Sequence, residues 1–293
     1  MNQVSTITQS ELSNMNAVMG SRKKGSSSSG VDYPKLSKIA MDQTTMIGKG
    51  RDAEKNPFFG CFFLKTEDPE EYVYGETMRI RVLNMVYQYV HTDFSRPEGS
   101  QFINKTIQFE DFRQEPRDEL GGIRCGKPTT KEMDGWPQED KDKYKDIKCT
   151  RIIRCLASYK GKKKNGEEVE VKNHPAIIFH KGNHFQDFEK QVNRVLPANA
   201  DWWDYEIELV PNFGVGQSGN QYANFTFKPI MKRLETTKEV YDSVLLVEEM
   251  IQSANEKVEA AYAAAIRARE VDHAALDAMN DSLAEDFDGG STN

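Results

Sequence analysis

Residues 147–180 read IKCTRIIRCLASYKGKKKNGEEVEVKNHPAIIFH, and this stretch decides the expected fold class. Runs of β-branched and aromatic residues flank Lys164-Asn165-Gly166, a tripeptide typical of tight hairpin turns. The pattern predicts a strand over 147–159, a turn, and further strand segments over 167–171 and 176–180. We therefore expect an antiparallel hairpin in a β-rich domain.

Similar runs, broken by Gly, Pro, Asn and Asp, continue on both sides of this hairpin. They predict strands over 58–65, 72–91, 102–112, 205–210 and 222–230, and short helices over 138–145 and 184–195. The expected fold is mainly β with some α: an OB-like, partly open barrel or sandwich, followed by a long C-terminal helix.

That C-terminal helix is predicted over 235–269. Thr236 and Glu239 have the spacing of a capping box. Apolar and small side chains then recur at alternating spacings of four and three, which is typical of a helix with one apolar stripe. This stripe either lies along the β-rich domain or joins copies of the chain as a homo-oligomer through 240–268; its members are Val240, Val244, Val247, Ile251, Ala254, Val258, Ala261, Ala265 and Ala268.

Charge and composition divide the rest of the chain. Residues 1–34 are rich in Ser, Asn and Gly and carry Arg22-Lys23-Lys24, which predicts a disordered basic arm before the domain at 35–234. Residues 270–293 hold seven acidic residues and no Lys or Arg, so they account for the whole formal net charge of -7. Such a segment predicts a disordered acidic tail.

Several protein classes are disfavoured. The longest apolar runs fall far below the roughly 20 residues that a membrane-spanning helix needs. The polar N-terminus does not look like a secretory signal, so we expect a cytoplasmic protein, in a host cell if it is viral. The four cysteines form no C-x-x-C pair and are expected as buried thiols without a cofactor. A structural zinc site is the weaker alternative, with candidate ligands Cys125, Cys149, Cys155, His174, His180 and His184.

The strongest functional signal is a basic stretch with interleaved aromatic residues. Residues 141–172 contain eleven Lys and Arg against five Asp and Glu. Cations that follow phosphates and flat rings that stack on bases are the two ingredients of single-strand binding. Each aromatic has a core position as its alternative, and Arg151 and Arg154 should point to opposite faces of their strand. The predicted nucleic-acid-binding residues are Trp136, Tyr144, Lys148, Arg151, Arg154, Tyr159, Lys160, Lys162, Lys163, Lys164 and Phe179.

Two other functions remain open. Glu170-Val171-Lys172 places a carboxylate and an ammonium on one face of a strand, and with Asp146 this spacing suits a metal-dependent nuclease. The same residues equally describe the solvent face of a hairpin, and we do not expect an enzyme. A structural or scaffolding protein of a phage particle, self-associating through its long helix, is the second alternative.

The layout resembles bacteriophage single-stranded DNA-binding proteins of the replication type. The resemblance lies in the basic arm, the acidic end with Phe287, and the segment Ile123-Arg124-Cys125-Gly126-Lys127-Pro128 followed by Trp136 and Arg151-Ile152-Ile153-Arg154. It implies an OB-fold that coats single-stranded DNA in replication or recombination without sequence preference. It also implies a tail that screens the DNA groove and recruits replication or recombination proteins through Asp281, Glu285, Asp286, Phe287 and Asp288.

Overall fold

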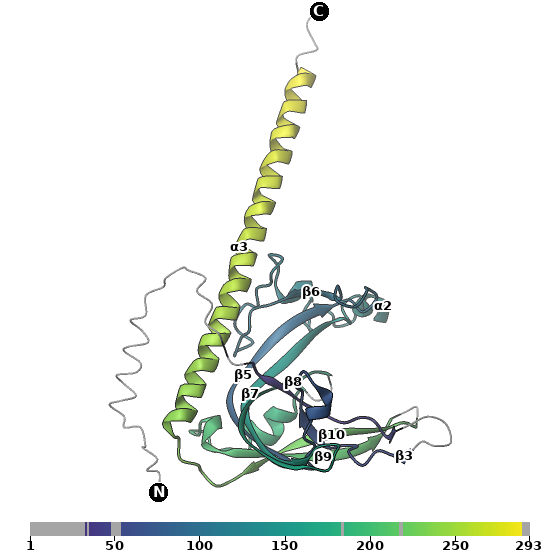
Figure 1. The fold of residues 1–293 in the computed structure, drawn as a ribbon. Coiled ribbons are helices and arrows are strands. Elements are labelled where there is room, and N and C mark those ends of the chain that lie inside the picture. Colours follow the sequence, from purple (N-terminus) through teal and green to yellow (C-terminus); the bar gives the residue numbers. More distant parts are fainter. Residues whose placement is uncertain (1–32, 34, 48–53, 183–184, 217–218, 289–293) are drawn as a thin grey trace, which may run out of the picture. The chain divides into compact units, whose positions relative to one another are not determined.

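The computed structural model describes residues 33, 35–47, 54–182, 185–216 and 219–288, with side chains as far as residue 271. Ten strands and one long C-terminal helix dominate this part of the chain (Figure 1), so the expected mainly β class is confirmed. The predicted arm at 1–34 lies almost entirely outside the described residues.

Eight of the strands form one mixed sheet, which is not closed into a barrel. Its order is β10-β9-β5-β7-β8-β1-β4, and β6 pairs with β5. A separate two-stranded sheet joins β2 (Met46–Ile47) to β3 (Glu54–Lys55). The strands of the large sheet are β1 (Ser37–Met41), β4 (Phe62–Leu64), β5 (Met78–Thr92), β6 (Phe102–Lys105), β7 (Ile147–Lys162), β8 (Glu168–His180), β9 (Glu206–Val215) and β10 (Gln221–Ile230).

The hairpin predicted from 147–180 is present as β7 and β8, paired antiparallel from Arg151↔His180 to Lys162↔Glu168. Its turn uses Gly166 at a φ of 87°, a region open to glycine at no steric cost. The Gly166 amide donates to the Lys163 carbonyl at 2.9 Å. The two predicted segments 167–171 and 176–180 form a single strand, because pairing with β7 continues past residues 172–175.

Contacts within the chain divide it into two units. The first contains the described part of 1–86 together with 151–250, and the second contains 87–150 with the rest of the chain from 251. The predicted domain at 35–234 therefore contributes to both units. Fully buried apolar side chains of the first unit include Phe62, Met78, Ile153 and Ile207, and the second unit buries Phe109.

The short helices are close to their expected places. Helix α2 covers Gln138–Asp142, inside the predicted 138–145. The predicted helix at 184–195 is reduced to a π-helical turn, η5, at Glu189–Asn193. Three 3₁₀ turns also lie within the described residues: η2 (Pro69–Glu71), η3 (Arg124–Gly126) and η6 (Trp202–Asp204).

Helix α3 runs from Lys238 to Asp288, well beyond the predicted end at 269. The sequence predicts a disordered tail over 270–293, whereas the helix of the structure continues to Asp288, over a segment in which alanine and other good helix formers recur among the acidic residues. The start of the helix differs by one residue from the expected cap: Glu239 bonds to Thr237, which lowers the pKa of its carboxyl. No helix of the described part is long and apolar enough to cross a membrane.

The apolar stripe of α3 is used within the chain itself. Val240, Val244 and Val247 are buried in the first unit, and Val258 is buried in the second. Burial of the stripe decreases towards its C-terminal end, where Ala265 is half-buried and Ala268 is exposed. These four valines are therefore not available as the oligomer contact that the sequence alone left open.

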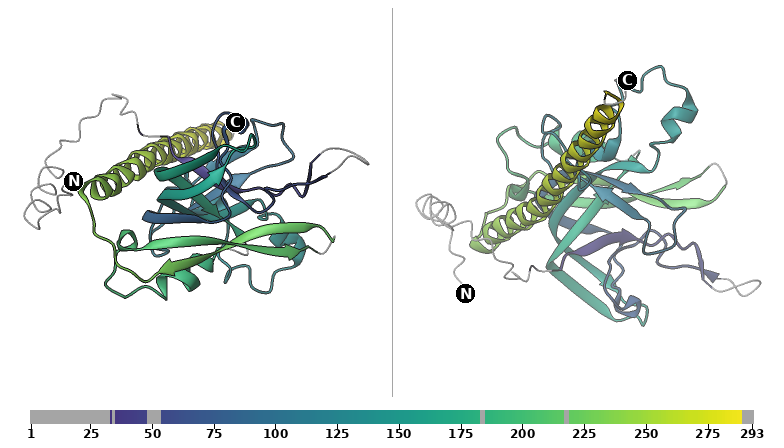
Figure 2. Two further views of the ribbon diagram at one scale, coloured as in Figure 1. Left: turned by 60° about the horizontal axis from the view of Figure 1, so that its bottom comes forward. Right: turned by 90° about the horizontal axis from the view of Figure 1, so that it is seen from above.

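Strands β9 and β10 form a long twisted ribbon at one edge of the large sheet (Figure 2). The outer edge of β10 bonds to side-chain amides. Ala223 donates its amide to Gln43 Oε1 at 3.0 Å, and Gln43 Nε2 donates to the Ala223 carbonyl at 2.7 Å. Further along, the Phe227 amide donates to Gln191 Oε1 at 2.7 Å. Two glutamines thus take positions that a neighbouring strand would occupy.

Candidate nucleic-acid interface

Three of the predicted binding residues are buried. Arg151, Arg154 and Tyr159 have exposed fractions of 1%, 6% and 7%. Their strand, β7, lies between β5 and β8 in the sheet and is buried over most of its length, so these side chains have no access to a ligand on the surface. Assigning them to the binding surface was wrong.

Contacts inside the first unit surround the side chains of Arg151 and Tyr159. The Arg151 guanidinium lies over the rings of Phe185 and Phe188, with centroids at 5.2 and 5.7 Å. The Tyr159 hydroxyl donates to the Val73 carbonyl at 3.1 Å, and burial raises the pKa of this phenol to about 12. Burial also lowers the pKa of Arg154 to about 10. Strand β7 thus buries two arginines within the fold.

The lysines at the end of the β7–β8 hairpin are matched by glutamates. Five lysines there lie within 4 Å of five glutamates, so the hairpin end has no surplus of positive charge. The pairs are Lys160–Glu170 (3.8 Å), Lys162–Glu168 (3.1 Å), Lys163–Glu71 (2.6 Å), Lys163–Glu167 (3.4 Å), Lys164–Glu70 (2.9 Å) and Lys172–Glu170 (2.9 Å).

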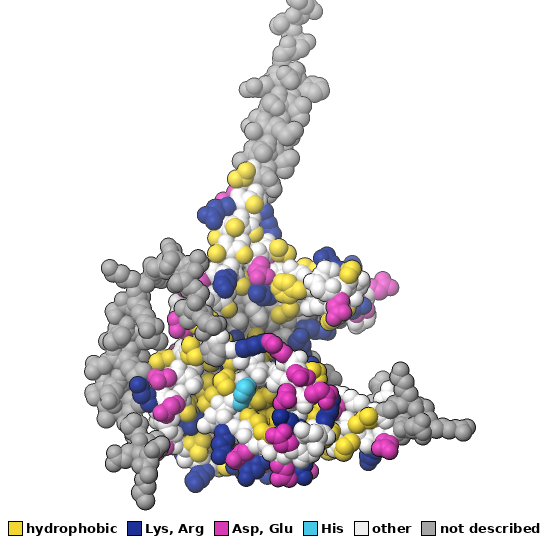
Figure 3. Space-filling model, in the orientation of Figure 1, with side chains coloured by type: hydrophobic (Ala, Val, Ile, Leu, Met, Phe, Trp, Pro, Cys, Tyr) yellow, Lys and Arg dark blue, Asp and Glu magenta, His cyan; other side chains and the backbone are white. Residues whose placement is uncertain are grey.

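Exposed ion pairs of this kind stabilise a fold little, but they cancel the local field. Basic and acidic side chains are likewise interleaved on the face that Figure 3 shows. The count of eleven basic against five acidic residues overestimated the charge of this region, because Glu70 and Glu71 come to it from η2, far away in the sequence.

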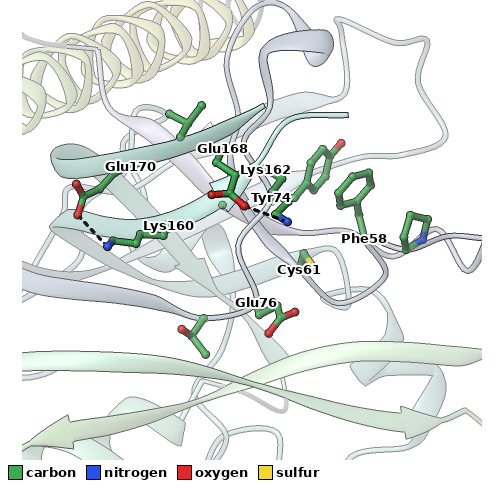
Figure 4. Close-up of a pocket in the computed structure, with 12 residues that line it drawn as sticks. Phe58, Cys61, Tyr74, Glu76, Lys160, Lys162, Glu168 and Glu170 are labelled. Carbon is green, nitrogen blue, oxygen red and sulfur yellow. Dashed lines mark ion pairs between the residues drawn. The ribbon is translucent and has the colours of Figure 1, made fainter. Parts of the chain in front are cut away.

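A pocket of about 720 Å³ lies beside these ion pairs (Figure 4). Its lining includes the stacked rings of Phe58 and Tyr74, with centroids 4.4 Å apart. The lining also contains the carboxylates Glu76, Glu168 and Glu170 against two lysines. A polyanion would meet three negative charges here, so this pocket does not suit nucleic acid.

Trp136, Tyr144 and Lys148 belong to the second unit. The two rings lie 6.4 Å apart at 51°, and Trp136 is 36% exposed. Burial, and next the charge of Lys148, lower the pKa of nearby Lys127. The surrounding segment 127–148 contains six lysines and six carboxylates, so this aromatic pair has no net positive surrounding in its own segment.

A different cluster, not anticipated from the sequence, lies where β8, β1 and β4 run side by side. Lys38 of β1 is in register with Ile177 of the parallel strand β8, two residues before Phe179. On the other side, the Lys65 amide donates to the Lys38 carbonyl at 2.9 Å. Residues in register, or two apart along a strand, share a face of the sheet. Lys65, Lys38 and Phe179 therefore form a row across three strands.

This row borders a cleft of about 590 Å³, which we call the Lys38–Phe179 cleft. Phe179 is 41% exposed, and the Lys38 ammonium lies 5.9 Å from the centre of its ring. Among the described residues, the lining of the cleft contains no acidic side chain; the members are Lys38, Phe179, His180, Lys181, Asn224 and Phe225.

The electrostatics of the cleft differ from those of the hairpin end. Among the residues that the structure describes, no carboxylate lies within 4 Å of the ammonium of Lys38, Lys65 or Lys181. Burial, followed by the charges of Lys65 and Lys181, lowers the pKa of Lys38. The three ammonium groups therefore repel one another, and a bound anion would relieve that repulsion.

The candidate metal ligands do not come together. The described residues contain no group of three His, Cys, Asp or Glu side chains placed to hold an ion, and His184 lies outside them. His174 bonds to the Ser37 hydroxyl at 3.0 Å, and the His180 ring lies against those of Phe225 and Phe227 at tilts of 52° and 51°. The nuclease candidate Glu170 accepts from Lys172 on the exposed face of the hairpin.

No protein-family model, curated protein or solved structure matches the chain. The side chains from residue 272 onward, including those of all five predicted partner-binding positions, lie outside the described part of the structure.

Proposed function

We propose that the protein binds single-stranded DNA through the Lys38–Phe179 cleft, without sequence preference and without catalysis. The observation that carries this proposal is the grouping of three lysines, none with a carboxylate within 4 Å in the described part, around an exposed aromatic ring. Cations and a free ring face together recognise features that every nucleotide of a single strand shares.

The charge pattern favours a polyanion over a neutral ligand. Lysines that already have carboxylate partners gain little from a phosphate, because the partner must first be displaced. Lys38, Lys65 and Lys181 have no such partner among the described residues, so each could release counterions when it meets a phosphate. The matched lysines of the hairpin end should contribute much less.

The ring favours a single strand over a duplex. The Phe179 side chain is 41% exposed, and a base can stack on its ring only when that base is not already stacked in a double helix. Stacking and phosphate contacts read no base edge, so the site should accept most sequences.

The proposal extends to the wider role that the resemblance implies. The protein would coat single strands during replication or recombination, and its strands would be a distorted, open relative of the OB-fold. The acidic end of α3 would compete with DNA for the three lysines and would recruit partner proteins. A chain that stops at Arg269 should then bind DNA more tightly than the full chain.

The test is fluorescence anisotropy with labelled oligothymidylate and a matched duplex over a salt series. The triple variant Lys38→Gln, Lys65→Gln, Lys181→Gln should reduce the slope of log affinity against log salt by about 2, at roughly 0.7 per lost phosphate contact. The control changes three matched lysines, Lys160, Lys162 and Lys164, to Gln, which alters the net charge by the same amount.

Phe179→Ala should weaken binding by about 1–3 kcal/mol, the usual effect of losing one stacked base. Its salt slope should stay unchanged, because no phosphate contact is removed. An equal loss in the control triple variant, or no binding of the full chain to any single strand, would overturn the proposal.

A further inference from the structure

The far end of the β9–β10 ribbon carries exposed apolar side chains. Phe213 is 58% exposed, Val215 67% and Tyr222 47%. Side chains of this size are seldom grouped at the surface without a ligand or partner. All three belong to the first unit, as does the Lys38–Phe179 cleft.

The Phe213 ring is held in a defined place. Its centre lies 5.7 Å from that of Phe59, at an angle of 40°. Gly60 lies directly beneath it, and a Cβ atom there would overlap the Phe213 ring. Because the glycine lets the ring approach the backbone, Phe213 keeps one side packed and leaves the other open to solvent.

A groove of about 640 Å³ runs beside this ring, and the described residues of its lining include no acidic side chain. Lys55 lines the groove, and no carboxylate of the described residues lies within 4 Å of its ammonium. The groove thus has the same combination as the cleft: an exposed ring together with a lysine that has no carboxylate within 4 Å among the described residues.

Strand β10 connects the two places. Ala223 of β10 is opposite Phe213 of β9, and Phe225, two residues further along, lines the Lys38–Phe179 cleft. Two residues of a strand span about 7 Å. A flexible strand that occupies the cleft can therefore reach the groove with a neighbouring nucleotide.

We propose that the groove beside Phe213 is a second subsite for the same single strand, in which Phe213 stacks one unpaired base and Lys55 meets a phosphate. This inference rests on the function proposed above. A protein partner is the other kind of occupant for an apolar surface. Nucleic acid is favoured by the aromatic ring surface, the cation, the absence of carboxylates from the described part of the lining, and the continuity with the cleft along β10.

The test uses the full chain and oligothymidylates of increasing length, from about 4 to 16 nucleotides, the range of site sizes in single-strand binders. Phe213→Ala should weaken binding of the longer oligonucleotides by about five- to 150-fold and leave the shortest unchanged. Phe179→Ala should weaken binding at every length. The number of nucleotides covered per protein should fall in the Phe213 variant alone.

Two further variants separate a loss of stacking at Phe213 from a loss of fold. Phe213→Trp should restore affinity and show fluorescence quenching by long oligonucleotides beyond that of the native tryptophans. Gly60→Ala keeps Phe213 but displaces its ring, so it should reproduce the length-dependent loss. Thermal unfolding of each variant identifies loss of fold, and the Trp variant decides the question if Phe213→Ala fails to fold.

The outcomes separate the two proposals. If Phe213→Ala binds every length like the native chain while Phe179→Ala does not, the cleft stands and the second subsite is wrong, which leaves the ribbon end as a surface for protein partners. If Phe213→Trp shows no added quenching with long oligonucleotides, stacking at this position is likewise refuted. If the native chain binds no single strand, both proposals fail.

Discussion

Gly161, near the end of β7, gives the sharpest test of the fold around the hairpin. A Cβ atom at this position would overlap the Tyr74 carbonyl and lie 2.9 Å from Val73 Cγ1. At this point Tyr74 and Lys162 exchange two backbone hydrogen bonds of 2.9 Å each. Gly161→Ala must push these segments apart and lose both bonds, at about 1 kcal/mol each.

The buried phenol of Tyr159 adds to this loss, because its hydroxyl donates to Val73 in the same segment. We expect Gly161→Ala to lower the free energy of unfolding by about 2–4 kcal/mol. Gly166→Ala in the same hairpin is the matched control. Nothing lies within 4 Å of its Cβ position, so only the left-handed backbone costs energy, about 1–2 kcal/mol.

Urea unfolding followed by circular dichroism measures both values, and amide exchange at Tyr74 and Lys162 locates the effect. Faster exchange at these two amides in Gly161→Ala, and not in Gly166→Ala, is the expected result. The reasoning is refuted if Gly161→Ala is as stable as the native chain, or if the two variants lose equal stability with identical exchange.

Three other predictions concern the Asn255 side chain, the raised pKa values of Cys125 and Tyr159, and the buried thiol of Cys155. Asn255→Ala removes two hydrogen bonds to the backbone of Gln108 (2.6 and 2.7 Å) and should destabilise the unit by about 1–3 kcal/mol, which urea unfolding would detect. Burial raises the pKa values of Cys125 and Tyr159 to about 12, from 9.0 and 10.0. The folded state therefore holds these protons more tightly than the unfolded state, and the free energy of unfolding should be highest below about pH 9 and fall between about pH 9 and 12. A pH series of unfolding curves would measure this fall. Cys155 is buried, with a raised pKa, and should resist alkylation in the native protein but react in denaturant, as mass spectrometry would show.

Local patterns predicted the β7–β8 hairpin well, because alternating strand residues and a Lys-Asn-Gly turn act over short distances. They failed for Arg151 and Arg154, since burial depends on where a strand lies in the sheet. β7 is central and both arginines are covered, although charged residues are rarely buried. The sheet order depends on pairing between distant segments, which a window of residues does not contain.

The candidate site also depends on contacts between segments that are distant in the sequence. Phe179 is a candidate from its place near the basic stretch alone. Lys38 and Lys65 are not, because they reach it only through the parallel pairing of β1 with β8 and the antiparallel pairing of β1 with β4. In contrast, the sequence around Lys163 and Lys164 predicts a basic surface, but Glu71 and Glu70, distant in the sequence, pair with them in the structure. Net charge along a sequence is a poor measure of charge on a surface.

The glutamine contacts on β10 have a consequence for a protein that would work at high local density. Exposed edge strands invite pairing with other chains, and proteins crowded along a polymer meet each other's edges constantly. Gln43 and Gln191 occupy backbone groups at Ala223 and Phe227 with their own amides, and Pro229 offers no amide hydrogen on the same strand. If copies lie next to one another on DNA as proposed, these contacts would hinder pairing through β10, so that each copy could dissociate by itself.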